Sequence, residues 1–354
     1  MFSAPAPGAL PPALAQNPTW QQVNKEINAN LKLDLAGTTL SASTKLATIV
    51  AGGALPDMLS LGPNPLLANL PAFLEASCAD LTPLLSGDAV KAYPNLANYP
   101  TYAWQAPGVV YNNKIFAVPV ARAIGGNALQ VHQQAAAKYD IGPIKSAADF
   151  KKALQRATNP KAGVWGISDQ TMTFTPLLAA QIFGAPNNWK LESGKLIKDY
   201  ETEEYKAGIG FLRDLWAAGV YHPYFSTDEG DAFVGGQFVF YYFIEDSFHY
   251  SWELVLSKKA VDKLTLIPPF SQDGTSKPQY FLGRGNFGGT VLKKASPDRV
   301  KELLSVLNFF GAPFGSQEDL LLTYGIENTD FTFDSMGNPT PKPNGFAKHR
   351  VPWA

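Results

Sequence analysis

The chain has 354 residues, a formal net charge of -1 at pH 7, and a composition that is 45% hydrophobic and 17% charged. This composition is typical of a globular protein and excludes an intrinsically disordered one. The near-neutral charge provides no basic field, so we expect neither nucleic acid nor an anionic membrane surface as a partner. The length favours two lobes with separate cores over a single domain.

The single cysteine, Cys78, limits the covalent chemistry that the chain can use. One cysteine excludes an intrachain disulfide. The residues before it, 73–77, do not form the apolar segment that precedes a lipid-anchor cysteine, so we predict a thiol packed against a helix. The sequence has no run of about 18 apolar residues, which argues against a transmembrane helix. Met1 to Leu14 lacks a basic start, so we identify no signal peptide in this chain.

The N-terminal part of the chain alternates between helix and strand signals. Asn17 followed by Pro18 is typical of a helix N-cap and first turn. An alternating order predicts a parallel sheet, and ligands bind at the carboxyl ends of the strands of such sheets. Asn64 follows one of these strands and is the first candidate ligand-binding residue. The predicted elements are a helix from Asn17, a strand over 31–35, a helix over 41–50 and a strand over 57–61.

The segment 114–154 predicts how two lobes are connected. Its apolar, β-branched run 115–120 indicates a buried strand. Gly125 and Gly126 follow as a bare hinge, and Ser146 with Asp149 forms a capping box that starts a helix. We therefore predict that the chain leaves a first lobe here and enters a second one.

The second lobe is predicted to hold strands whose ends carry polar residues. Gln170 follows the short strand 165–167, and Glu245 follows the continuous apolar strand 238–244. Gly283 to Gly289 indicates a return crossing, which contains Arg284 and Asn286. The predicted organisation is a first lobe over 1–120, a second lobe over 121–282, a return segment over 283–312, and a second crossing with an incomplete C-terminal segment over 313–354.

Two patterns resemble enzyme motifs, but their context favours other functions. Gly283 to Gly288 matches GxGxxG, yet a strand-like segment follows where a dinucleotide fold requires a helix. Glu245 and Asp246 are adjacent on a strand, so they point to opposite faces and cannot flank one glycosidic bond. The four histidines lack metal-ligand spacing, so we expect no metal and no cofactor. These histidines are His132, His222, His249 and His349.

Five motifs together resemble bacterial ABC-transporter extracellular solute-binding proteins of family 1, in its LipO-like, carbohydrate-type branch. They occur in the family order between about Asn17 and Pro339. The motifs are 114–119 (similar to "GKIYAVP"), 159–167 ("NP.G..WGI"), 184–189 ("FGAPN.W"), 215–223 ("L...G..HP") and 324–339 ("YGIEG.DY...G.P").

The resemblance implies an α/β, two-lobed, periplasmic-binding-protein-like fold of class II, hinged by several crossing strands. It implies a monomer that captures a carbohydrate, such as an oligosaccharide, in the inter-lobe cleft and delivers it to ABC permease subunits. It also implies an extracytoplasmic location with a lipid anchor that this chain lacks. Family members have a complete first strand, of which only Phe2 to Ala4 could remain here, so we expect a trimmed chain.

The candidate site combines residues from the predicted strand ends and from the two crossings. Trp104 is the candidate stacking platform, because it lies in the loop before the hinge, with core packing as the alternative. Arg122 and Arg284 reach the cleft or form surface ion pairs. A ligand that contacts both lobes only when they are shut binds the closed state better. The candidate ligand-binding residues are Asn64, Trp104, Arg122, Gln170, Glu245, Arg284 and Asn286.

Two alternatives remain open at the level of sequence. One is a carbohydrate-active hydrolase that uses Glu245 and a distant carboxylate. The other is a peptide- or lipid-binding member of the same fold. The assignment of a sugar ligand depends on the resemblance alone.

Overall fold

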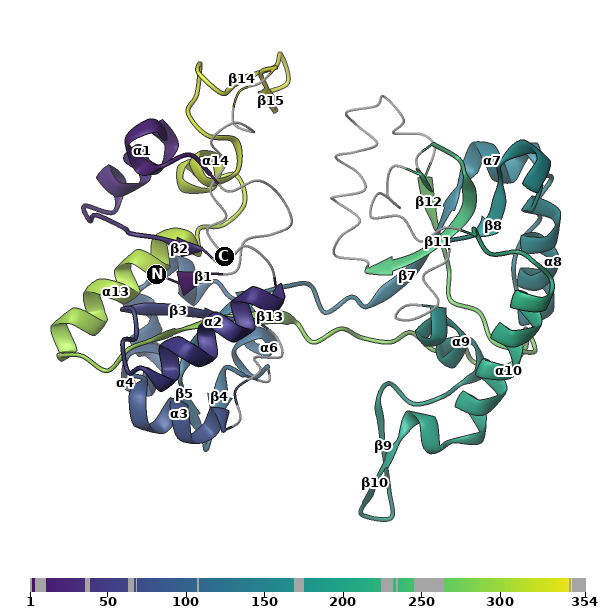
Figure 1. Cartoon of the computed structure of the whole chain (residues 1–354), viewed down its shortest axis with the longest axis horizontal. Helices are drawn as coiled ribbons and strands as arrows, with labels where there is room; N and C mark the ends of the chain where they lie inside the picture. Colours follow the sequence, from purple (N-terminus) through teal and green to yellow (C-terminus); the bar gives the residue numbers. More distant parts are fainter. Residues whose placement is uncertain are drawn as a thin grey trace. The chain divides into compact units, whose positions relative to one another are not determined.

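The structure is a computed structural model that describes residues 2–3, 11–35, 39–62, 67, 69–106, 108–168, 175–223, 232–233, 235–244, 264–343 and 345. Contacts between residues divide the chain into two compact units (Figure 1). Unit 1 comprises Met1–Arg122 and Arg284–Ala354, and unit 2 comprises Ala123–Gly283. The chain therefore passes between the units twice, at residues 122–123 and 283–284.

Unit 1 is built on a mixed five-stranded sheet with the order β2-β1-β3-β13-β6. The first three strands are parallel, as expected, but β13 is antiparallel to both β3 and β6 because it returns from unit 2. The sheet strands are β1 (Phe2–Ser3), β2 (Asp34–Leu35), β3 (Met58–Leu61), β6 (Ala117–Ala121) and β13 (Asn286–Leu292); the small pairs are β4 (Val110–Tyr111) with β5 (Lys114–Ile115) and β14 (Phe331–Phe333) with β15 (Pro339–Pro341). The helices are η1 (Leu14–Gln16), α1 (Pro18–Glu26), α2 (Thr39–Ala51), α3 (Leu70–Ser77), α4 (Thr82–Leu85), η2 (Gly87–Ala92), α5 (Pro94–Ala97), α6 (Thr101–Trp104), α13 (Pro297–Phe310) and α14 (Gln317–Tyr324).

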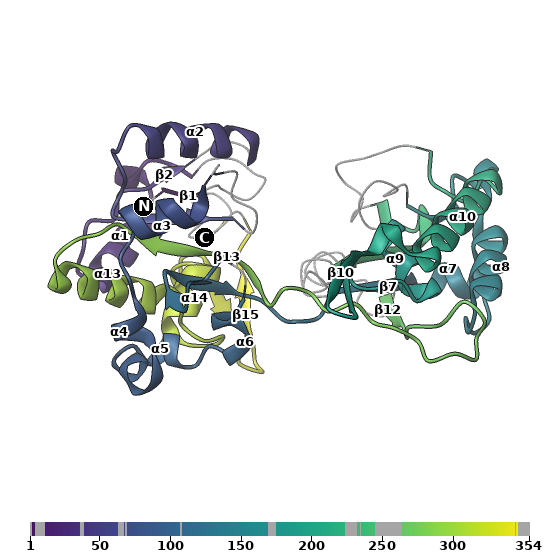
Figure 2. The ribbon, with the colours of Figure 1, turned by 90° about the horizontal axis from the view of Figure 1, so that it is seen from below.

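Helices cover both faces of this sheet, and each face has its own apolar cluster. One cluster joins the sheet to α2 and α3, and the other joins it to α1 and α13. Figure 2 shows α2 and α13 on opposite sides of the strands. Val291 and Leu292, neighbours on β13, belong to different clusters, because successive side chains of a strand point to opposite faces. Cys78 is only 1% exposed in the α3 cluster, which confirms the predicted packed thiol.

The start of α1 shows why the sequence signal was sufficient there. The side chain of Asn17 accepts a hydrogen bond from the backbone nitrogen of Trp20 at 3.0 Å, and Pro18 occupies the first turn. Trp20 then buries its ring, and its Nε1 donates to the carbonyl oxygen of Leu31 at 3.0 Å. The predicted helix is therefore confirmed, and its first turn is tied to the segment that precedes β2.

The segment after residue 312 differs from the sequence expectation of a second crossing. All of Arg284–Ala354 belongs to unit 1. Within it, α14 contacts α1 and α13, and Leu321 and Leu322 pack against the cluster that contains Leu304. Because the apolar side of α14 is used in this way, the segment stays with unit 1.

Unit 2 contains a four-stranded sheet with the order β12-β7-β11-β8. Strand β7 is antiparallel to β11 and β12, and β11 is parallel to β8. Consequently β8, β11 and β12 all run toward the edge where β7 begins, and β11 reaches it at Ile244. The elements of unit 2 are β7 (Asn127–His132), α7 (Gln133–Lys138), α8 (Ala147–Ala157), η3 (Pro160–Ala162), β8 (Trp165–Ile167), α9 (Thr175–Phe183), β9 (Trp189–Glu192), β10 (Lys195–Lys198), η4 (Asp199–Glu201), α10 (Glu203–Ala217), β11 (Phe238–Ile244) and β12 (Leu264–Ile267).

Helices α8, α9 and α10 pack on one face of this sheet. The predicted capping box of α8 is confirmed, because Ser146 Oγ accepts from the nitrogen of Asp149 at 3.1 Å and donates to Asp149 Oδ2 at 2.9 Å. Phe150 and Leu154 are then buried on the same helix face, as predicted. The ring of Phe150 meets that of Phe240 edge to face at 5.5 Å, which joins α8 to the central strand β11.

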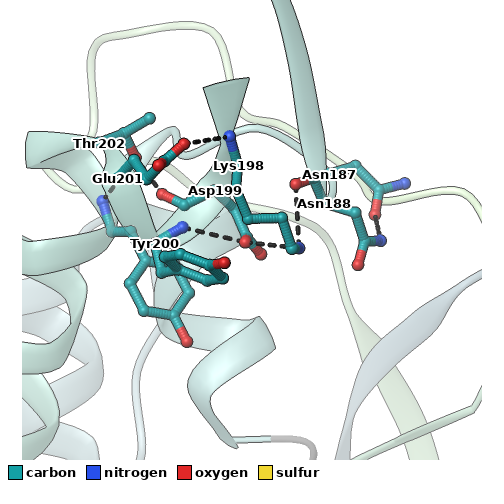
Figure 3. A network of polar contacts seen from close by, with 8 residues as sticks. Asn187, Asn188, Lys198, Asp199, Tyr200, Glu201 and Thr202 are labelled. Atoms are coloured by element: carbon teal, nitrogen blue, oxygen red, sulfur yellow. Dashed lines mark hydrogen bonds and ion pairs between the residues drawn. The ribbon is translucent and has the colours of Figure 1, made fainter. Parts of the chain in front are cut away.

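The hairpin β9–β10 projects from unit 2, and a polar network holds its base (Figure 3). Lys198 Nζ donates to Asp199 Oδ1 at 2.7 Å and to the carbonyl oxygen of Asn188 at 3.0 Å. Asn187 Nδ2 donates to the carbonyl oxygen of Leu282 at 2.9 Å. The motif at 184–189 therefore fixes the hairpin to the segment that leads out of unit 2.

Candidate functional site

The two chain segments that connect the units are paired at both of their ends. In unit 1, the nitrogen of Arg122 donates to the carbonyl oxygen of Gly285 at 3.0 Å. In unit 2, the nitrogen of Gly283 donates to the carbonyl oxygen of Ile124 at 2.8 Å. We call residues 122–126 and 280–285 the crossing. The predicted return crossing therefore lies beside the predicted hinge rather than far from it.

A bulge shapes the crossing where it enters unit 1. The register of β13 against β6 shifts between Asn286 and Gly289. Gly288 has a φ of 88°, and a Cβ atom there would lie 2.0 Å from the carbonyl oxygen of Leu61. Only glycine allows β13 to approach β3 so closely. The extra residue leaves the side chain of Phe287 on the surface, where it is 54% exposed.

Three residues of unit 1 form an exposed surface beside the bulge, which we call the aromatic–arginine patch: Tyr102, Arg122 and Phe287. The guanidinium carbon of Arg122 lies 5.2 Å from the centre of the Phe287 ring. Tyr102 Oη donates to the carbonyl oxygen of Arg122 at 3.0 Å, and its side chain is 37% exposed. The patch offers aromatic ring faces next to a fixed cation, which suits a ligand with both apolar faces and hydroxyl groups.

The other predicted residues of unit 1 lie near the patch in sequence but differ in exposure. Trp104 is half-buried at the end of α6, where its ring packs on the unit 1 core and lies 6.0 Å from the ring of Tyr99. Asn286 is 6% exposed and pairs with Ala121. Arg284 is exposed at the first position of the return into unit 1. Their roles in ligand binding stay predictions.

Sequence reasoning named Arg122 as a candidate but did not name its two aromatic neighbours. Phe287 stands between glycines and an asparagine in the stretch Gly283 to Gly289, a poor environment for a core residue. That isolation was a usable signal for an exposed ring. Tyr102 had no such signal, because only the hydrogen bond to Arg122 shows where it lies.

The sheet edge of unit 2 next to the crossing is a second candidate surface, within unit 2 alone. At this edge Ile244 of β11 pairs with Asn127, the first residue of β7. Strand ends of this kind are where open α/β sheets bind ligands. The predicted residues Gln170 and Glu245 follow β8 and β11 in sequence, but both lie outside the described residues, as does Asn64 of unit 1.

Buried hydrogen bonds anchor the crossing inside unit 2. Gln181 Oε1 accepts from the nitrogen of Phe281 at 3.2 Å and from Tyr242 Oη at 3.4 Å. Burial, with a smaller contribution from Tyr280, raises the pKa of Tyr242, so its hydroxyl remains a donor. Tyr280 Oη accepts from the nitrogen of Gly126 at 2.9 Å. We call the hydrogen bonds that Gln181 and Tyr280 accept from Phe281 and Gly126 the anchor of the crossing. They hold both segments of the crossing.

The GxGxxG pattern forms no phosphate cradle, because its second half is the start of β13 and no helix follows. Among the described residues, no group of three His, Cys, Asp or Glu side chains could hold a metal ion. Within the same part of the chain, no helix is long and apolar enough to cross a membrane.

No protein-family model matches the chain. Lipoprotein LipO of Bacillus subtilis (strain 168) is 26% identical over 156 residues, a match that spans 42% of this chain and 30% of LipO.

Solved structures resemble the chain over nearly its whole length. FusA, an ABC-transporter substrate-binding protein of S. pneumoniae in complex with kestose, has a TM-score of 0.65 and 15% identity, covering 99% of this chain and 76% of FusA. The N-glycan transport solute-binding protein NgtS of Streptococcus pneumoniae, in complex with Man1GlcNAc, has a TM-score of 0.63 and 17% identity, covering 99% of this chain and 76% of NgtS. The galacto-N-biose-/lacto-N-biose I-binding protein of Bifidobacterium longum has a TM-score of 0.55 and 17% identity, covering 88% of this chain and 73% of that protein.

At these identities the likeness concerns the fold. The chain has the two-unit α/β fold of the substrate-binding proteins of ABC transporters.

Proposed function

We propose that this chain is the extracytoplasmic solute-binding component of an ABC importer, and that it captures a carbohydrate, such as an oligosaccharide, for delivery to a permease. The single observation that carries the proposal is the fold likeness to carbohydrate-binding transport proteins over 99% of the chain. The partial match to the lipoprotein LipO supports the extracytoplasmic location in this proposal. Binding without turnover is part of the proposal.

The aromatic–arginine patch is the described surface best suited to a sugar. A sugar ring has an apolar face that stacks on aromatic rings and hydroxyl groups that accept from a guanidinium. We propose that Asn64, Gln170 and Glu245 add hydrogen bonds from the predicted strand ends. A ligand that contacts both units binds one arrangement of the units better than others and so shifts the population toward it.

A thermal-shift screen of the full chain against oligosaccharides tests the proposal. Kestose and Man1GlcNAc are the first probes, because structural relatives were solved with them. A ligand present at about 100 times its Kd adds about 2.7 kcal/mol to the free energy of unfolding, which raises the melting temperature measurably. A flat response across fructo-, manno-, gluco- and galacto-oligosaccharides, checked by calorimetry, would contradict the proposal.

The patch is tested by Phe287→Ala, with Phe314→Ala as the matched control. Both rings are exposed in unit 1, 54% for Phe287 and 89% for Phe314. Loss of one stacked aromatic ring is expected to weaken sugar binding about tenfold, since aromatic contacts contribute about 0.5–1.5 kcal/mol beyond the buried area. Phe314→Ala should leave affinity unchanged. Equal affinities of the two variants would remove the patch from the proposed site.

A turnover assay separates the proposal from the hydrolase alternative. If the wild-type chain releases hydrolysis products from an oligosaccharide and the Glu245→Gln variant does not, the chain is a hydrolase and the proposal of binding without turnover is wrong. Peptide and fatty-acid probes in the same thermal screen address the remaining alternative. A melting shift with these probes and none with sugars would reassign the ligand class.

A further inference from the structure

Unit 2 contains a pocket that neither the patch nor the predicted strand-end residues explain. Its volume is about 190 Å³. It lies between β7, the end of β12 and helix α9, and its walls are mostly apolar. Apolar walls come from Leu129, Leu178, Ile182, Leu266, Ile267 and Phe270.

The volume and the walls define the class of molecule that fits. An apolar cavity of about 150 Å³ stays dry and binds benzene, so a cavity of this size holds about eight non-hydrogen atoms. A predominantly hydroxylated ligand would lose its water and find hydrogen-bond partners only at one margin, because the remaining walls are apolar. A sugar ring therefore does not suit this pocket, and a small hydrocarbon or arene does.

The polar margin of the pocket is formed by Asn127 and by two residues that hold the crossing, Gln181 and Tyr280. Gln181 Oε1 accepts from the nitrogen of Phe281, and Tyr280 Oη accepts from the nitrogen of Gly126. A Cβ atom on Gly126 would lie 1.8 Å from the carbonyl oxygen of Phe281, so the two segments of the crossing are packed backbone against backbone here. A molecule in the pocket therefore contacts the side chains that hold the crossing.

We propose that this pocket binds a small apolar molecule of about eight non-hydrogen atoms and that its occupant stabilises the anchor of the crossing. The pocket shares Asn127 with the sheet edge of unit 2 described above, but its apolar walls do not depend on the proposed carbohydrate function. Filling the pocket restores dispersion contacts for the walls and limits the movement of Gln181 and Tyr280. The hydrogen bonds from the amides of Phe281 and Gly126 to these two side chains then open less often.

The test uses ethylbenzene as the probe and the full chain as the protein. Saturation-transfer NMR should detect saturable binding. The variant Ile267→Trp adds ring volume at a half-buried wall position and should abolish it. The control Ile144→Trp changes a half-buried isoleucine that packs on the same unit 2 cluster but does not line the pocket, and it should bind as the wild type does.

Hydrogen exchange provides a second readout in the unmodified chain. The amides of Gly126 and Phe281 should exchange more slowly with ethylbenzene present. This measurement decides the matter if Ile267→Trp does not fold. Absence of saturable binding, binding that persists in a folded Ile267→Trp variant, or unchanged exchange at both amides each overturns the proposal. Equal affinity for 1-dodecanol overturns the size limit on the ligand.

Discussion

Replacing Gly288 with alanine perturbs the point where β13 begins to pair with the end of β3. Gly288 has a φ of 88°, which L-residues adopt only with strain. A Cβ atom would also lie 2.0 Å from the carbonyl oxygen of Leu61 and 2.7 Å from the carbonyl carbon of Gly62. Both obstacles are backbone atoms at the end of β3 and in the residue after it, so no side chain can rotate away to make room.

The cost has two parts of similar size. The left-handed backbone conformation costs about 1–2 kcal/mol for a residue with a Cβ atom. The overlap forces β3 and β13 apart, and overpacking of this kind costs about 1–3 kcal/mol. We therefore expect Gly288→Ala to lower the free energy of unfolding by about 2–5 kcal/mol, a large share of the stability of a typical domain. The displaced bulge should also move Phe287 and weaken the aromatic–arginine patch.

Gly108 provides a matched control in the same unit. Its φ is 89°, but nothing lies within 4 Å of the position of its Cβ atom. Gly108→Ala should therefore lose only about 1–2 kcal/mol. Urea unfolding measures both variants, and hydrogen exchange on peptides from 58–61, 286–292 and, for unit 2, 127–132 localises the loss. If the two variants lose equal stability, the close approach of β13 to β3 is refuted.

Three further predictions concern a cap, a carboxylate and the thiol. Asn17→Ala should cost about 1–2 kcal/mol in urea unfolding, because the amide of Trp20 loses its acceptor in a buried position, whereas Asn17→Asp should cost less. Asp273 accepts hydrogen bonds from Ser276 Oγ and nitrogen, the nitrogen of Thr275 and Ser271 Oγ, which lower its pKa. Its contribution to stability is present above about pH 4 and is lost as the pH falls toward the folded pKa, so the stability gap to Asp273→Asn should close in acid; a constant gap would contradict this. Burial raises the pKa of Cys78 to about 12, so iodoacetamide should label it at pH 8 only after urea unfolding, and rapid labelling of the folded chain would show an exposed thiol.

The sequence predicted a helix start correctly wherever the capping hydrogen bonds join residues close together in the chain. The cap at Asn17 and the capping box of Ser146 and Asp149 are complete within three residues, so the sequence located both helices. The motifs that carried the family resemblance are also local. Gly219 with φ 67° and Gly325 with φ 85° end helices, and such turns are legible as sequence patterns.

The sequence did not predict the direction of β13 or the unit to which α14 belongs. The alternation of helix and strand near the N-terminus predicted a parallel sheet, but it carried no information about β13, which arrives from more than 160 residues later and pairs antiparallel. Likewise, the apolar side of α14 has the same sequence signature whichever unit it packs on.

The candidate site was only partly accessible from sequence. Arg122 was identified from its place after the predicted hinge strand, and its position at the crossing agrees with that reasoning. Its neighbours Tyr102 and Phe287 come from segments 20 and 165 residues away, and only tertiary structure brings them together. Trp104 shows a second limit of sequence reasoning. The sequence around an aromatic residue in a predicted loop is the same whether its ring contacts a ligand or packs on the core, and the ring of Trp104 packs on the core.

The sequence alone determined the class of fold, through its family motifs, and the helix caps at Asn17 and Ser146, because capping residues act over a few positions. Tertiary structure decided the direction of β13, the membership of α14, the aromatic–arginine patch and the apolar pocket beside Gln181 and Tyr280. These features depend on contacts between residues that are distant in the chain, and the energy of such contacts is set by packing that no local pattern records.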